Sequence, residues 1–233
     1  MAKHLDLEEQ EQLDELKHFW KTYGNLITWA LIVVLGAFAG WNAYQYWQKN
    51  QATQSAALFD EVERSVSAGD LTRLERSLTD MKEKFGGTTY ASQAALLAAK
   101  AFFDMDKTDS AKAALRWVAE NSPDEGYRAV ARLRLAGILV GQKAYEDAST
   151  QLASPFPKEF EGLVSDRRGD IASLQGKKSV AIDEYQKAYK LLDGQTDYRR
   201  LVEVKLNALG VDPLAGAPAS ADVVAAARPG DRK

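Results

Sequence analysis

Residues 169–189 have the sequence GDIASLQGKKSVAIDEYQKAY, the clearest structural signal in the chain. Gly176 interrupts a first helical pattern. The second pattern carries Ala181, Tyr185 and Ala188 at three- and four-residue steps, which puts them on one face of a helix. The stretch therefore predicts two helices joined by a short turn, packed closely where the residues are small.

Similar helix pairs recur along the chain. If Ala111, Ala148 and Ala181 are equivalent, the units are offset by 37 and 33 residues, near the period of about 34 residues of tetratricopeptide repeats. The sequence thus predicts an all-α fold, a tetratricopeptide-like α-solenoid, with an unrelated helical bundle as the alternative. The expected helices are 51–68, 71–85, 90–104, 110–121, 127–140, 145–152, 163–174, 179–192 and 198–209.

An apolar segment precedes the repeats. The 27 positions between Lys21 and Lys49 carry no charge, and about 20 residues of helix cross a bilayer core. Aromatic residues of the kind that settle at membrane interfaces mark both ends. The pattern predicts a single transmembrane helix at 23–47. The aromatic residues are Trp20, Tyr23, Trp41, Tyr44, Tyr46 and Trp47.

Two other interpretations of this segment are open. A buried core helix is equally apolar, and the Ala37-Phe38-Ala39 stretch imitates a signal-peptide cleavage site. Against cleavage, the preceding segment is long and acidic, and the apolar pattern continues to Trp47. The uncleaved anchor is therefore the preferred interpretation.

The anchor divides the chain into four expected parts. Three lysines precede the span and only Lys49 and Arg64 follow it closely, which favours a cytoplasmic amino terminus. The parts are a cytoplasmic acidic arm (1–22), the transmembrane helix (23–47), a tetratricopeptide-like periplasmic domain (48–210) and a disordered tail rich in Ala and Pro (211–233).

Within the span, Gly36 and Gly40 form a GxxxG pair. Two glycines four residues apart leave a shallow surface on which another membrane helix can pack closely. The pair is accordingly predicted to contact a partner helix. Because Gly is frequent in membrane helices, chance occurrence of the motif is the alternative.

Composition excludes several kinds of chemistry. The chain has no Cys, and its two histidines are His4 and His18, so thiolate chemistry and most His-based sites are absent from the repeats. Residues 49–233 contain 27 basic and 27 acidic side chains, which argues against nucleic-acid binding. We expect no catalytic residues, no cofactor and no metal: a non-enzymatic protein.

One pair of carboxylates needs a separate interpretation. Asp166 and Asp170 are one helical turn apart and could coordinate a cation. Three basic residues nearby, Arg167, Arg168 and Lys177, make ordinary ion pairing the preferred interpretation.

Stacked helix pairs expose a concave surface lined by the first helix of each pair. In the first two pairs this surface is mostly apolar, which suits an apolar segment of a partner protein. The alternative is that another helix of the same chain, 51–68 or 198–209, fills it. The predicted groove residues are Leu96, Lys100, Phe103, Val130, Leu133, Gly137 and Val140, followed by polar Asp166, Asp170 and Ser173 in the third pair.

Taken in order along the chain, these features resemble one protein family. The acidic arm, the span with GAFAGWNAYQY at 36–46, the WQKNQ exit at 47–51 and the unit at 169–189 are similar to YfgM-like ancillary subunits of the SecYEG translocon. The resemblance covers roughly residues 1–210 and leaves out the Ala/Pro-rich tail.

The resemblance implies a Gram-negative inner-membrane protein whose domain lies in the periplasm. It further implies partners: the SecYEG channel, a membrane-anchored prolyl isomerase and chaperone of the PpiD type, and emerging client proteins. We therefore expect a non-enzymatic interaction module that links the channel to these chaperones and clients. A scaffold for cell-envelope or division complexes is the alternative function.

Overall fold

The computed structural model describes residues 7–192 and 197–213, and all regular secondary structure in these ranges is helical. The chain divides into two compact units between Ala57 and Leu58. Nearly all of the predicted tail at 211–233 lies outside the described residues.

Helix α1 extends from Leu7 to Ala68 without interruption, so neither 22/23 nor 47/48 coincides with a break in the helix. It is long and apolar enough to cross a membrane. Nearly all large apolar side chains of its segment between Lys21 and Lys49 are exposed, with Leu26 at 69% and Phe38 at 66%. A core helix would bury such residues, so their exposure contradicts the core-helix alternative and agrees with a lipid-facing helix.

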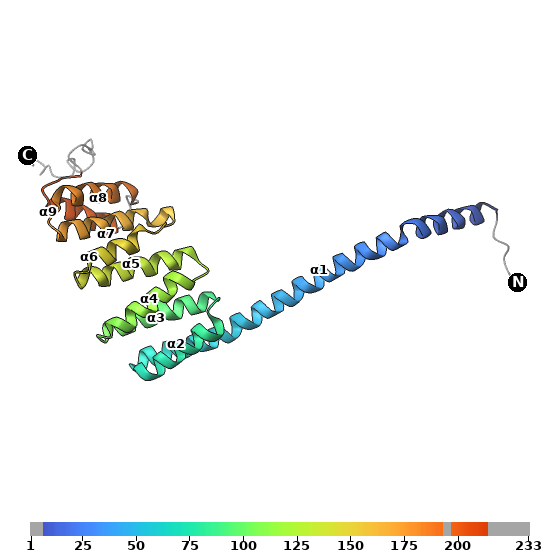
Figure 1. Ribbon diagram of the computed structural model, residues 1–233, viewed down its shortest axis with the longest axis horizontal. Helices are drawn as coiled ribbons and strands as arrows, with labels where there is room; N and C mark the ends of the chain where they lie inside the picture. The colour runs from blue at the N-terminus through green and yellow to red at the C-terminus, as the bar shows by residue number, and fades with distance from the viewer. Residues whose placement is uncertain (1–6, 193–196, 214–233) are drawn as a thin grey trace, which may run out of the picture. The chain divides into compact units, whose positions relative to one another are not determined.

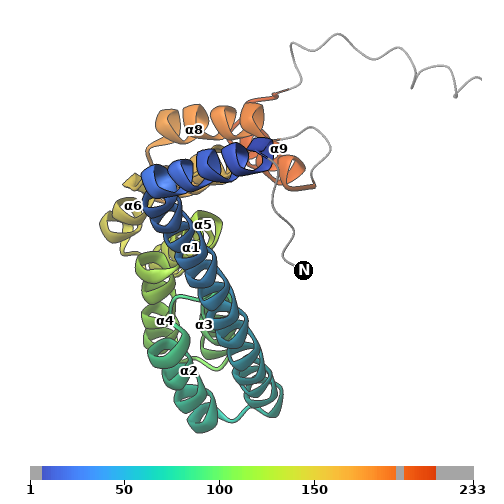
Figure 2. The same ribbon diagram turned by 90° about the vertical axis from the view of Figure 1, so that its right-hand side faces the viewer.

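The second unit is a stack of helix pairs. Figure 1 shows α2 to α8 following one another in sequence order, and Figure 2 shows α3 and α4 side by side. Eight of the nine predicted helices, from 71–85 to 198–209, are confirmed to within a few residues at each end, whereas the predicted helix 51–68 is the last part of α1 and does not begin at 51. Their bounds are α2 Leu71–Phe85, α3 Thr89–Asp104, α4 Thr108–Asn121, α5 Glu125–Gly141, α6 Tyr145–Ala153, η1 Lys158–Phe160, α7 Glu161–Leu174, α8 Lys178–Leu191 and α9 Asp197–Ala208.

The turn inside each pair has the same backbone geometry. Asp106, Lys143 and Gly176 all adopt left-handed conformations, with φ of 59°, 61° and 74°. The next amide always donates to the carbonyl five residues back, at 2.7–2.9 Å, which closes the end of the first helix. The turns are offset by 37 and 33 residues, which confirms the predicted repeat. Five residues after each turn lies a fully buried alanine: Ala111, Ala148 and Ala181.

This turn also occurs at both ends of the stack. Gly69, 37 residues before Asp106, has φ of 67°, so the end of α1 and helix α2 form a preceding pair. Gly210, 34 residues after Gly176, has φ of 80°, and the Val211 amide donates to the Leu206 carbonyl at 3.0 Å. Helix α9 is therefore the first helix of a further unit, and the described residues after it, up to 213, form no second helix.

Small residues set the spacing of the helices. The core of the first pairs is rich in fully buried alanines, around larger side chains such as Phe102 and Leu115. In the last complete pair, Gly169 of α7 lies directly against the ring of Tyr185 in α8. Because glycine has no side chain to intervene at this contact, the two helices of the pair pack closely against each other.

Candidate interaction groove

A groove with a volume of about 800 Å³ lies on the surface formed by the first helices of the pairs. Most of its lining is apolar, and the charged residues that line it are basic. It is contained entirely within the second unit. Its lining includes Ala99, Lys100 and Phe103 from α3, Leu115 from α4, Leu133, Arg134, Gly137 and Ile138 from α5, Leu163 and Arg167 from α7, and Tyr198 from α9.

Four of the seven groove residues predicted for the first two pairs line this groove: Lys100, Phe103, Leu133 and Gly137. Lys100 and Phe103 lie one turn apart on α3, and Leu133 faces them from α5. Phe103 is 50% exposed, which is unusual for a large aromatic side chain in a helical domain. These side chains are available to a ligand, and their contact with a partner stays a prediction.

The other three candidates lie deeper. Leu96 is only 7% exposed and belongs to the core, while Val130 and Val140 are partly buried and packed against it. Helical periodicity gives the face of a helix on which a residue lies, but packing of the neighbouring pair decides how much of that face stays open. Partner contact by these residues stays a prediction as well.

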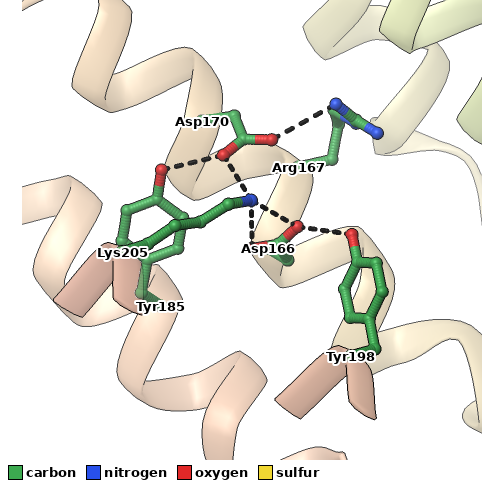
Figure 3. A network of polar contacts seen from close by, with 6 residues as sticks. All are labelled: Asp166, Arg167, Asp170, Tyr185, Tyr198 and Lys205. Atoms are coloured by element: carbon green, nitrogen blue, oxygen red, sulfur yellow. Dashed lines mark hydrogen bonds and ion pairs between the residues drawn. The ribbon is translucent and has the colours of Figure 1, made fainter. Parts of the chain in front are cut away.

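In the third pair the predicted groove surface is covered at Asp166 and Asp170, whereas Ser173 is exposed. Asp166, expected on the open surface, is fully buried. Its carboxylate accepts bonds from the Lys205 Nζ at 2.7 and 2.8 Å and from the Tyr198 hydroxyl at 2.7 Å, both on α9 (Figure 3). Helix α9 therefore occupies this part of the surface, as one of the alternatives foresaw, and leaves the groove between α3 and α5 open.

Asp170 extends the same network. Its carboxylate accepts from the Lys205 Nζ at 2.7 Å, the Tyr185 hydroxyl at 2.8 Å and the Arg167 guanidinium at 3.2 Å (Figure 3). Burial, together with the bonds to these carboxylates, raises the pKa of Tyr185 and Tyr198 above the ordinary tyrosine range.

Ion pairing was thus the right interpretation of the two carboxylates, but Lys205 is the main partner. Of the three local cations, Arg167 contacts Asp170, whereas Arg168 donates to the Leu152 carbonyl. Among the residues that the structure describes, no group of three acidic or histidine side chains is arranged to hold a metal ion.

Arg134, Arg167 and Tyr198 were not predicted as groove residues. A signal was present in the repeat itself: Arg134 and Arg167 each lie nine residues before the left-handed turn of their pair, at Lys143 and Gly176. Equivalent positions in adjacent units stack on the same surface of a solenoid, so the register alone could have paired them.

The glycine pair lies in the apolar part of α1. A Cβ atom added at Gly36 or at Gly40 would meet nothing within 4 Å. The chain itself therefore leaves room at both positions, and their contact with a partner helix stays a prediction.

Comparison with protein-family models identifies the class of protein to which the chain belongs. A family model described as a tetratricopeptide repeat-like domain matches residues 17–211. The match agrees with the repeated turns and the buried alanines of the stack. No solved structure matches the chain significantly.

Curated relatives then give the family. A Neisseria gonorrhoeae protein named ancillary SecYEG translocon subunit is 32% identical over 90% of this chain and all of its own length. Proteins of the same name from Haemophilus influenzae and Escherichia coli are 26% and 25% identical, each over 87% of this chain and 98% and 97% of their own lengths. The chain belongs to the family of ancillary SecYEG translocon subunits.

Proposed function

We propose that this protein is a non-enzymatic, membrane-anchored subunit of the SecYEG translocon. The observation that carries the proposal is the match to relatives of that name along the anchor helix and the stack together. The apolar α1 supports a place in the bacterial inner membrane. The excess of Lys before the span supports a cytoplasmic amino terminus and a periplasmic domain.

In this proposal the groove holds a partner segment at the channel exit. Its apolar lining suits emerging client chains and a periplasmic chaperone of the PpiD type. The tether keeps the groove at a high local concentration beside the channel, so weak individual contacts suffice. No reaction is required of the protein, only binding and release.

In-membrane crosslinking of the full-length protein, mild-detergent extraction and mass spectrometry test the assignment. Recovery of SecYEG and a periplasmic chaperone is the expected result. Recovery of division or outer-membrane assembly proteins without SecYEG would overturn the function and favour the envelope scaffold.

Phe103→Glu is expected to lower recovery of the chaperone and clients about 10-fold or more, because the variant removes a large apolar contact and places a charge in the groove. The fold should remain intact, since half of the Phe103 side chain is already exposed. Leu174→Glu is the matched control, because Leu174 is 58% exposed and does not line the groove. Equal losses in both variants would contradict a specific role for the groove.

Gly36→Leu with Gly40→Leu is expected to lower SecYEG recovery several-fold while leaving the domain folded. A Cβ atom added at either glycine would meet nothing within 4 Å, so the substitutions are expected to act through a partner helix. Ala30→Leu, on another face of the same helix, is the control. Full SecYEG recovery from the double variant would mean that the glycine pair is incidental.

A further inference from the structure

The charged lining of the groove has one sign. Lys100, Arg134 and Arg167 line it, and no Asp or Glu does so in the described part of the chain. Two acids pair with these cations from outside the groove: Asp104 with Lys100 and Asp170 with Arg167. The Lys100–Asp104 pair is exposed on both sides, so it contributes little and yields readily to a ligand.

The two arginines are brought together by the repeat. Both lie nine residues before the left-handed turn of their pair. A Cβ on Gly137 would lie 3.9 Å from the Cζ and Nη2 atoms of Arg167, so this guanidinium lies against α5. Arg134 is three residues before Gly137 and therefore shares its side of the helix. The groove thus presents two guanidinium groups beside the same stretch of α5: that of Arg134, which belongs to α5, and that of Arg167, which reaches over from α7.

Both guanidinium groups have unused hydrogen-bonding capacity. Within residues 7–192 and 197–213, the Arg134 side chain takes part in no hydrogen bond or ion pair, and the residue is exposed. The Nε of Arg167 is buried without a hydrogen-bond partner, although its Nη1 donates to Asp170. A guanidinium has five N–H donors and matches a carboxylate geometrically. The Arg134 guanidinium therefore lacks an anionic partner among the described residues, and Arg167 has only Asp170.

We propose that the groove binds a polypeptide segment that combines apolar side chains with a side-chain carboxylate. The apolar side chains pack against Phe103 and Leu133, and the carboxylate of an Asp or Glu accepts hydrogen bonds from Arg134 and Arg167. The inference rests on the proposed use of the groove for partner binding, and it adds the chemistry that the groove selects.

The apolar side chains of the groove, such as Phe103 and Leu133, make this selection effective. A carboxylate beside apolar side chains is poorly screened, so its bonds to Arg are stronger than at an open surface. A segment with lysine at the same place would bring a third charge of equal sign to the two arginines. The groove therefore prefers acidic apolar segments over neutral ones, and disfavours basic ones.

Fluorescence anisotropy of the full-length protein in detergent tests the preference. The probes are three fluorescent peptides of about eight residues, capped at both ends, with the same leucines and with two aspartates, two asparagines or two lysines between them. We expect the aspartate peptide to bind about 10-fold more tightly than the asparagine peptide, with the lysine peptide weakest. The advantage of the aspartate peptide should shrink as salt rises.

Variants of Arg134 test whether this residue causes the preference for the aspartate peptide. Arg134→Gln should reduce the advantage of the aspartate peptide several-fold while the asparagine peptide binds as before, and Arg134→Glu should reduce it further. Arg116→Gln, on an exposed arginine of α4 outside the groove, should change nothing. Equal affinities for the three peptides, or the same response from Arg116→Gln, would overturn the carboxylate assignment.

A photo-crosslinker at position 103 in native membranes separates this inference from the proposed function. Loss of SecYEG from the isolated complexes would refute the proposed function, whatever the peptides do. Crosslinks to a chaperone without peptide discrimination would retain the proposed function and overturn the charge preference. Crosslinks only to a second copy, or only to residues 214–233 of the same chain, would overturn the partner-segment assignment.

Discussion

Replacing Asp166 with Ala is expected to lower the stability of the α7–α9 region by about 3–5 kcal/mol. Asp166 is fully buried, and its carboxylate is the acceptor for Lys205 and Tyr198. Removing it leaves the Lys205 ammonium, 22% exposed, facing Asp170 alone, and leaves the Tyr198 hydroxyl without its acceptor.

Amide hydrogen exchange of the full-length protein is the measurement, because units of a solenoid open locally. Protection of α9 should fall by about 150-fold or more, while α3 and α4 change little. Lys84→Met is the control, since the Lys84–Asp80 pair is exposed on both sides and its loss should cost less than about 0.5 kcal/mol. Unchanged protection of α9 in the Asp166 variant would show that apolar packing alone holds this helix.

Gly169→Ala is expected to destabilise the third pair by about 2–3 kcal/mol. A Cβ at this position would lie 2.5 Å from the Cδ1 and Cε1 atoms of Tyr185. The ring cannot move aside freely, because the Tyr185 hydroxyl donates to Asp170 at 2.8 Å. Either α8 moves away from α7 or this hydrogen bond is lost. Hydrogen exchange of α7 and α8 measures the change.

Gly137→Ala is a matched control, for which we expect a change in stability of the opposite sign. Gly137 lies inside α5, where the new methyl group would meet its nearest atoms only at 3.9 Å. Removing a glycine from a helix interior should then stabilise α5 by about 0.5–1 kcal/mol. Destabilisation of equal size in both variants would mean that the close contact with Tyr185 is not the cause.

The sequence predicted the helices well because their limits are local. Gly69 and Asp70 separate α1 from α2, and the Asp70 side chain accepts from the Arg73 amide at 3.0 Å as an N-cap. The repeat was found from its alanines. Its turns were harder to predict. A glycine such as Gly176 indicates a left-handed turn, but Asp106 and Lys143 adopt the same conformation without a glycine.

The parts that escaped prediction depend on contacts distant in sequence. Lys205 lies 39 residues from Asp166, so only the stacking of α9 on α7 brings the two charges together. Similarly, Leu96 and Phe103 lie on one helix, yet one is in the core and the other lines the groove. Periodicity places both near one side of α3, and only the neighbouring pair determines which side chain stays open.

The left-handed turn at Gly210 makes α9 a first helix without a second one in the described residues. In a linear array of units, an end element has one neighbour where an internal element has two, so it opens at the lowest free energy. Within the described residues, melting of the stack should therefore start at α9 and proceed inward. Because α9 contributes Tyr198 to the groove, its opening would remove one end of the groove lining, and the Asp166–Lys205 pair, which joins α9 to α7, opposes this loss.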